Sequence, residues 1–172
     1  MNDTLKSISE RRSIKGYTDR MPSREDIDLV IKAGLEAASG RNKQGAIIIA
    51  ITDKAVRDRL SLANAGILGA SADPFYGAPA VLVVLRDKSV NTSVYDGSLV
   101  MGNMMLAAHS LGLGSCWIHR AREVFDLPEW KEWLKSIGVE GDFEGVGNLV
   151  LGYRAGEYPE HKPRLDGRVF YV

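Results

Sequence analysis

The sequence predicts a single domain that combines helices with buried β-strands. The chain has 172 residues, of which 45% are hydrophobic and 26% charged, as in one globular domain with a sizeable core. Two apolar runs rich in β-branched residues, 46–52 and 79–85, have the pattern of strands buried on both faces. Residues 96–110 contain strong helix formers and no proline, which predicts one long helix.

The charge balance and the N-terminus indicate a cytoplasmic protein without a nucleic-acid or membrane partner. The 22 basic residues equal the 22 acidic ones, and no basic run would attract nucleic acid or an anionic membrane. The first residues lack the apolar core of a signal peptide. Cys116 is the one cysteine and cannot form an internal disulfide, which is typical of a reducing compartment.

The chain should begin with a short helix. Asn2 or Asp3 is expected to cap it, and it should run through about Glu10. Leu5 and Ile8 would then form its inner face.

The next elements alternate between helix and strand. Ser23, with Asp26 three residues on, resembles a capping box for a helix to about residue 38. After the strand at 46–52, Asp53 should cap a helix through about Ala63. Residues 64–77 are rich in glycine and alanine, and we interpret them mainly as a loop.

The second half begins with the helix at 96–110, which is apolar nearly all round. Such a helix is buried on several sides, in a domain centre or against a second chain. Gly112 and Gly114 can take positive φ and end it, and 115–118 reads as a short buried strand. Pro128 suits the first turn of a later helix, and 145–153 is the last clear core strand.

Two basic clusters lie near opposite ends of the chain. If residues 11–15 are extended, Arg11, Ser13 and Lys15 point one way while Arg12 points the other. Two cations and a hydroxyl on one side suit a phosphate. A second cation pair, Lys162 and Arg164, lies in the polar tail. Alone, a cluster of this kind is more often a solvated surface.

The tail itself, 154–172, has little of a core-forming pattern until five strand-like residues at its end, 168–172. A polar arm of this kind suits crossing a surface and pairing with a sheet edge, including that of another subunit.

No motif predicts a nucleophilic or metal-dependent enzyme. Gly112 and Gly114 follow a helix and precede a strand, the wrong order for a dinucleotide fingerprint. The three histidines and Cys116 lack metal-ligand spacing, so we expect no metal. Cys116 and His119 would face opposite sides of a strand.

The order of these segments along the chain resembles that found in the nitroreductase family. The segment that resembles it most specifically is 103–118. The resemblance covers nearly the whole chain and rests on residues 11–15, 39–44, 77–84, 103–118, 149–153 and 162–164.

That resemblance implies an α+β fold with a mixed, mostly antiparallel sheet sandwiched by helices. It implies one FMN-binding domain over residues 1–172, in a homodimer whose C-terminal strand is exchanged between subunits. The arm at 154–172 would reach the partner subunit. Two FMN molecules would bind at the interface, each touching both chains.

The resemblance also implies the residues that contact FMN. The two basic clusters would bind its phosphate, Lys15 its ring edge, and the loop at 39–44 the flavin held mainly by the partner. Asn64 would reach the pyrimidine side, and 115–118 would pass beside the ring. The implied cofactor-binding residues are Arg11, Arg12, Ser13, Lys15, Ser39, Gly40, Arg41, Asn42, Gln44, Asn64, Ser115, Cys116, Trp117, Ile118, Lys162 and Arg164.

The activity implied is hydride transfer from NADH or NADPH through FMN to a flat acceptor such as a nitroaromatic or quinone, by ping-pong in one pocket. No side chain need be catalytic. Three alternatives stay open: a specialised family member such as a reductive dehalogenase or flavin-fragmenting enzyme, a non-catalytic FMN-binding module, and a dimer without cofactor. Phe75, Tyr76 and Trp130 are either pocket walls or core. His119 and Arg120 stand where the family often has glycines or an acidic residue.

Overall fold

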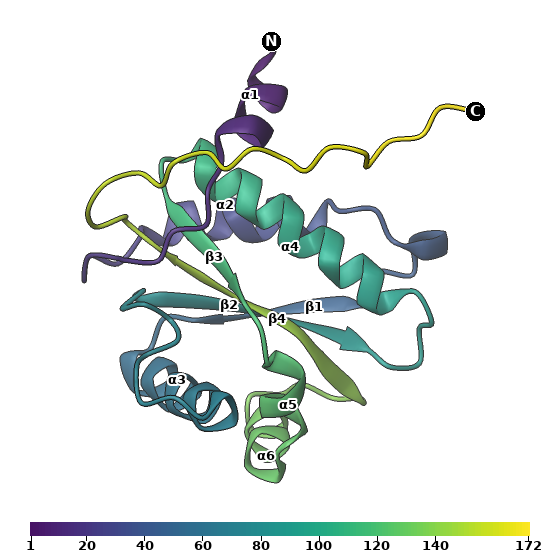
Figure 1. The fold of residues 1–172 in the computed structure, drawn as a ribbon. Helices are drawn as coiled ribbons and strands as arrows, with labels where there is room; N and C mark the ends of the chain where they lie inside the picture. Colours follow the sequence, from purple (N-terminus) through teal and green to yellow (C-terminus); the bar gives the residue numbers. More distant parts are fainter.

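The computed structural model describes residues 1–172 and contains one four-stranded sheet with helices on both faces (Figure 1). The strand order is β1-β2-β4-β3, and all three strand pairs are antiparallel. The predicted α+β class is confirmed. The strands are β1 Ala46–Ile51, β2 Ala80–Asp87, β3 Gly114–Ile118 and β4 Phe143–Gly152.

The helices divide between the two faces of the sheet. Helices α2 and α4 cover one face, and α3, α5 and α6 cover the other (Figure 1). A single 3₁₀ turn, η1, lies between α2 and β1. The helices are α1 Asp3–Glu10, α2 Arg24–Leu35, η1 Gly40–Asn42, α3 Lys54–Leu68, α4 Ser93–Ser110, α5 Ala121–Asp126 and α6 Pro128–Ser136.

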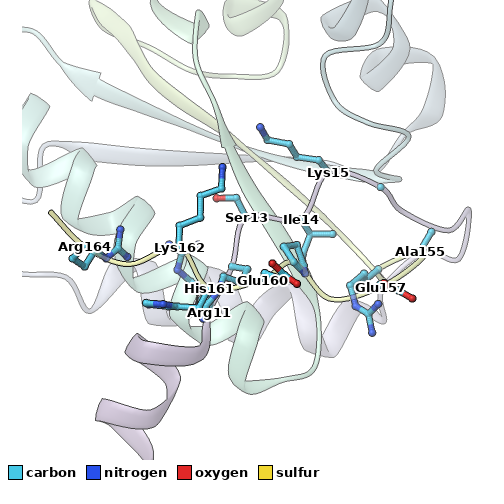
Figure 2. A pocket seen from close by; sticks show the side chains of 14 residues that line it. Arg11, Ser13, Ile14, Lys15, Ala155, Glu157, Glu160, His161, Lys162 and Arg164 are labelled. Carbon is cyan, nitrogen blue, oxygen red and sulfur yellow. Dashed lines mark hydrogen bonds between the residues drawn. The ribbon is translucent and has the colours of Figure 1, made fainter.

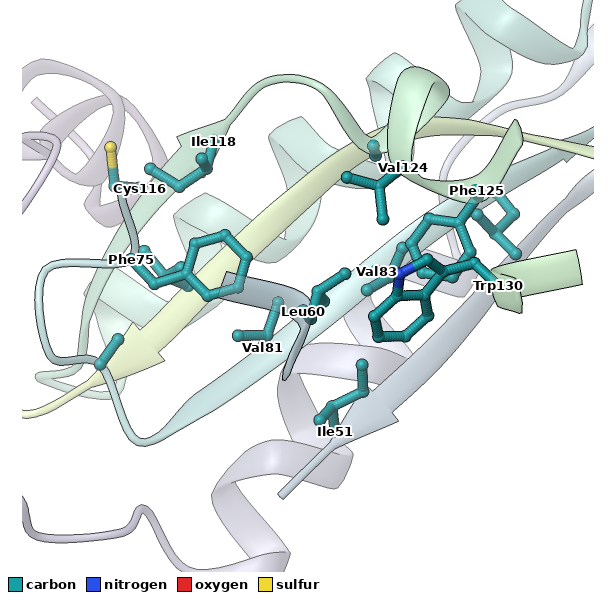
Figure 3. Close-up of a cluster of buried hydrophobic side chains, with 14 of the residues drawn as sticks. Ile51, Leu60, Phe75, Val81, Val83, Cys116, Ile118, Val124, Phe125 and Trp130 are labelled. Carbon is teal, nitrogen blue, oxygen red and sulfur yellow. The ribbon is translucent and has the colours of Figure 1, made fainter. Parts of the chain in front are cut away.

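The core has two halves because successive side chains of a strand point to opposite faces. Strand β2 is paired on both sides and buried almost throughout. Its Val81 and Val83 join the half beneath α3, α5 and α6 (Figure 3). Its Leu82 and Val84 join the half beneath α2 and α4.

The predicted N-caps are confirmed. The side chains of Asn2, Ser23 and Asp53 each accept a hydrogen bond from the amide three residues on, at 2.9–3.0 Å. This pairing satisfies one of the free N–H groups of a helix N-terminus. Local sequence therefore determines where these three helices begin.

Helix α3 is longer than predicted. It continues past Ala63 to Leu68 and ends in a left-handed C-cap at Gly69, where φ is 71°. No proline interrupts these residues, so the helix stops only where glycine offers positive φ. The prediction of a loop from residue 64 was therefore wrong, and Asn64 lies on the buried side of a helix.

Several apolar residues predicted to be buried are exposed in the single chain. Leu5 is 52% exposed and Ile8 53%, so α1 buries no residue. Strand β1 is a sheet edge, and most of its residues are half-buried instead of covered on both faces. Residues 168–172 of the tail are exposed and form no strand within the chain. None of the helices combines the length and apolarity needed to cross a membrane.

Candidate functional site

Residues from the two ends of the chain line one cavity of about 520 Å³ (Figure 2). The first wall is residues 11–16 and the second lies within residues 154–164. Both predicted basic clusters therefore meet at one place, although some 150 residues separate them. The predicted residues that line this cavity are Arg11, Arg12, Ser13, Lys15, Lys162 and Arg164.

The first wall is held against the edge of the sheet by β3, the outermost strand. Ser13 forms a parallel bridge with Ser115, and the Ile14 amide donates to the Ser115 carbonyl at 3.0 Å. Ile14 is buried, which by alternation turns Ser13 and Lys15 to the cavity. A Cβ on Gly114 would come within 3.0 Å of Ile14, so glycine permits this approach. Of the two glycines expected to take positive φ at the end of α4, Gly112 does and Gly114 does not.

The second wall is fastened by Tyr158, which sequence reasoning missed. The Tyr158 hydroxyl accepts from the Arg12 amide at 3.1 Å and donates to the Glu10 carbonyl at 2.9 Å. The Arg154 guanidinium lies over the same ring, 5.6 Å from its centre. These contacts hold the start of the tail against the N-terminal segment.

A Tyr158→Phe variant should bind FMN about 3- to 10-fold more weakly, because it loses two hydrogen bonds that position the tail, each contributing about 1 kcal/mol at most. Titration of the cofactor-free protein with FMN, followed by flavin fluorescence, measures the dissociation constant. Tyr171→Phe is the matched control, since the Tyr171 side chain is 95% exposed in the single chain and its hydroxyl forms no hydrogen bond there. Equal affinities of the Tyr158→Phe variant and the wild type would contradict this role.

The cavity fits an anionic group. The Nη1 atom of Arg11 is buried and has no hydrogen-bond partner, and a buried donor without a partner is costly. A phosphate in the cavity would supply the partner. Arg12 is less suited, because its Nη1 already donates to the carbonyls of Ser9 and Arg11, at 2.7 and 2.8 Å.

A second cavity, of about 330 Å³, shares Lys15 with the first. It is lined by Tyr76 and by the predicted residues Cys116, Trp117 and Ile118 of β3. Ser115 lines a smaller cavity of about 190 Å³, which Arg11 also lines. The first and second cavities adjoin at Lys15 and give the site a basic end and a more apolar end.

Of the three aromatic residues considered as walls, only Tyr76 lines this site. Tyr76 is 38% exposed, and the Lys15 ammonium lies 5.9 Å from its ring centre. Phe75 and Trp130 are completely or almost completely buried in the core beneath α3, α5 and α6 (Figure 3). Their apolar side chains stabilise the sheet and do not line the cavity.

The loop that carries Tyr76 is organised by Asp73. Burial alone would raise the pKa of Asp73, but its hydrogen bonds outweigh this effect and hold the pKa below the ordinary value. The Arg57 guanidinium and the Ser61 hydroxyl each donate at 2.5 Å. Backbone amides complete the set, so the carboxylate accepts from Arg57, Ser61, Phe75 and Gly77. This network stabilises the turn at Tyr76, whose φ is 56°.

The Cys116 thiol is poorly suited to act as a nucleophile. Burial raises its pKa, and the hydrogen bond with Ser13 and the charges of Lys15 and Arg11 only partly oppose this effect. A thiol held neutral is a weak nucleophile. Cys116 therefore serves as a small wall residue.

Asn64 lines none of the cavities described above. Its side chain is completely buried, and its Nδ2 donates to the His119 carbonyl at 2.9 Å. Its Oδ1 accepts from Arg120 Nε at 3.0 Å. Both polar atoms of the Asn64 side chain thus bind the loop after β3, and a direct contact with the pyrimidine side of FMN stays a prediction.

The polar loop at 39–44 lies away from the cavities described above, beside the start of α4. The Gly40 amide donates to the Asp96 carboxylate at 3.0 Å. Arg41, Asn42 and Gln44 have positive φ, from 49° to 54°, an uncommon conformation for residues other than glycine. These three residues and Ser39 do not line the basic cavity of their own chain.

Comparison with known proteins places the chain in a family. The model described as "Nitroreductase family" matches residues 8–71 and 68–141. A protein of Archaeoglobus fulgidus, provisionally named an NADH dehydrogenase/NAD(P)H nitroreductase, is 33% identical over 89% of this chain and 86% of its own. An FMN reductase [NAD(P)H] of Bacillus subtilis is 29% identical over 96% of this chain and 71% of its own.

Solved structures agree with this match. A nitroreductase with bound FMN from Bacteroides fragilis superposes with a TM-score of 0.89 and 27% identity, over all of both chains. The fold and the cavity define a class of α+β protein with a basic site at the edge of an antiparallel sheet. The chain belongs to the nitroreductase family.

Proposed function

We propose that this protein is an FMN-dependent oxidoreductase that passes hydride from NADH or NADPH to a flat acceptor such as a nitroaromatic or quinone. The observation that carries the proposal is the basic cavity, where the buried Arg11 Nη1 lacks a partner. The Bacillus subtilis relative named as an FMN reductase and the FMN-bound structure from Bacteroides fragilis support it.

Different residues of the first and second cavities would bind different parts of FMN. Arg11, Lys162 and Arg164 would hold the phosphate at the basic end. Ser13 and Lys15 would follow the ribityl chain and the ring edge, because Lys15 lines both the basic cavity and the second cavity. When bound, FMN supplies the hydride-transfer chemistry between nicotinamide and acceptor.

The remaining task of the protein is to stabilise charge and admit flat molecules. An ammonium group at the ring edge, from Lys15, would stabilise negative charge that develops there during transfer. The apolar side of the second cavity suits a nicotinamide and then an acceptor in turn. No residue need act as a nucleophile, which agrees with the neutral Cys116 thiol.

We further propose that two copies form a homodimer, each a single domain of residues 1–172, with FMN at the interface. Exposed apolar residues of α1, the half-buried edge strand β1 and the unpaired tail end at 168–172 support it. In that assembly the arm at 154–172 would pair with the partner's sheet, and the loop at 39–44 would reach the partner's FMN. We place this assembly in the cytoplasm, in keeping with the lone free cysteine.

The purified protein should be yellow, and its flavin absorbance should bleach without oxygen when NADH or NADPH is added. Adding p-benzoquinone or a nitroaromatic should restore the absorbance, and the rates should give parallel double-reciprocal lines. A non-catalytic FMN-binding module would keep its absorbance unchanged after NAD(P)H. A protein that retains no FMN would contradict the proposal.

A further inference from the structure

The second cavity contains an arginine that has a fixed position but no acidic partner. Arg120 is half-buried and lines this cavity. Arg57 and Arg86 are also largely shielded from solvent, and each has an acidic partner, Asp73 and Glu144 respectively. Arg120 forms no ion pair. A guanidinium without an acidic partner in a cavity is suited to bind an anion.

Two features hold the Arg120 side chain in place. Its Nε donates to the Oδ1 of Asn64 at 3.0 Å, and Asn64 is itself completely buried and tied to the His119 carbonyl. The backbone of Arg120 has φ 72° immediately before α5, an uncommon conformation that such surroundings must stabilise. The Nη atoms make no protein hydrogen bond, so they remain available to a ligand.

The surroundings of Arg120 carry a net positive charge and an apolar surface. Lys15 is the second cation of the cavity. Its one carboxylate, Asp73, already accepts four hydrogen bonds and pairs with Arg57. Apolar side chains that include Leu68, Pro74 and Ile118 make up much of the rest. A flat aromatic molecule with one anionic group matches this combination.

We propose that Arg120 is a specificity-determining residue that binds the anionic group of the acceptor, so that carboxylated nitroaromatics and quinones are the preferred substrate class. The inference rests on the proposed oxidoreductase function and deepens it. Asn64 is the positioning residue in this arrangement, acting through its hydrogen bond to Arg120. A phosphate of NADH or NADPH offers the same chemistry, and the kinetics below separate the two sources.

The test compares Arg120→Gln with Arg122→Gln in the FMN-loaded protein. Both variants lose one positive charge within the same segment. Arg122 is 71% exposed and lies outside the second cavity. In a ping-pong reaction kcat/KM for the acceptor and for the nicotinamide report separate half-reactions. Arg120→Gln should lower kcat/KM for 4-nitrobenzoate about 10-fold, as expected for one charge-assisted hydrogen bond, while nitrobenzene and NADPH stay within about 2-fold.

A binding measurement gives a second readout that does not depend on turnover. Benzoate, which cannot accept hydride, should perturb the flavin spectrum, and its dissociation constant should rise about 10-fold in Arg120→Gln only. Equal losses for 4-nitrobenzoate and nitrobenzene, or a loss confined to NADPH, would overturn the acceptor assignment. If NAD(P)H fails to bleach wild-type flavin, the proposed function fails, whereas charge-dependent benzoate binding still decides whether Arg120 binds anions.

Discussion

An Arg11→Ala, Arg164→Ala double variant is expected to lose FMN during gel filtration, with an affinity at least about 100-fold below that of the wild type. The Arg11 guanidinium has a buried atom without a partner, and Arg164 lines the same cavity from the other end of the chain. Two charge-assisted contacts of roughly 1.5–3 kcal/mol each would account for a loss of this order or larger. The flavin-to-protein ratio after gel filtration and an FMN titration measure it.

The matched control is an Arg24→Ala, Arg122→Ala double variant, which removes the same charge from exposed sites. The Arg24 side chain is 86% exposed in its ion pair with Asp28, and Arg122 is 71% exposed. This control should keep FMN. Sedimentation velocity should show that both double variants have the wild-type assembly state. Retention of FMN by the Arg11, Arg164 variant would refute the phosphate site.

The second large effect concerns stability. Asp73→Asn should lower the free energy of unfolding by about 2–3 kcal/mol at pH 7, because it leaves the buried Arg57 guanidinium with only the more exposed Asp58 as a charged partner. The loss is smaller than for a completely buried pair, because the Asp73 side chain is 34% exposed and solvent screens it. Urea unfolding followed by tryptophan fluorescence measures the difference.

Acid should remove the difference in unfolding free energy between the wild type and Asp73→Asn. The folded state lowers the pKa of Asp73, so its contribution is fully present above the ordinary carboxyl pKa of about 4. It is lost as the pH falls through the lower, folded-state value. The gap between wild type and Asp73→Asn should therefore narrow below about pH 4. Asp58→Asn is the control, since Asp58 also pairs with Arg57 but is exposed, and its effect should be much smaller.

Local sequence predicted the parts of this fold that depend on neighbouring residues. The caps at Asn2, Ser23 and Asp53 each need one side chain and an amide three residues away. The central strand β2 is apolar at successive positions because it is paired and covered on both sides. Only the family resemblance predicted that the two basic clusters meet. Alternation along an extended segment shows which way a side chain points, but not which distant residue it meets.

The parts that sequence did not reveal depend on contacts between distant residues. Tyr158 fastens the tail through backbone groups 146 and 148 residues away, and no local pattern marks such a residue. Asn64 was placed in a loop, and only its position on the buried face of α3 explains why its amide faces Arg120. The pairing of Arg57 with Asp73 likewise requires the helix and the following loop to fold back together.

The joining of head and tail at the basic cavity has a consequence for synthesis of the chain. A nascent chain that has emerged from the ribosome only as far as Gly152 contains all four strands. It still lacks the second cavity wall, which lies within residues 154–164. The complete cavity can therefore form only after residues 154–164 have been synthesised. Closing a loop of nearly the full chain length is also entropically costly and slow. The cavity should consequently be among the last regions to become ordered during folding.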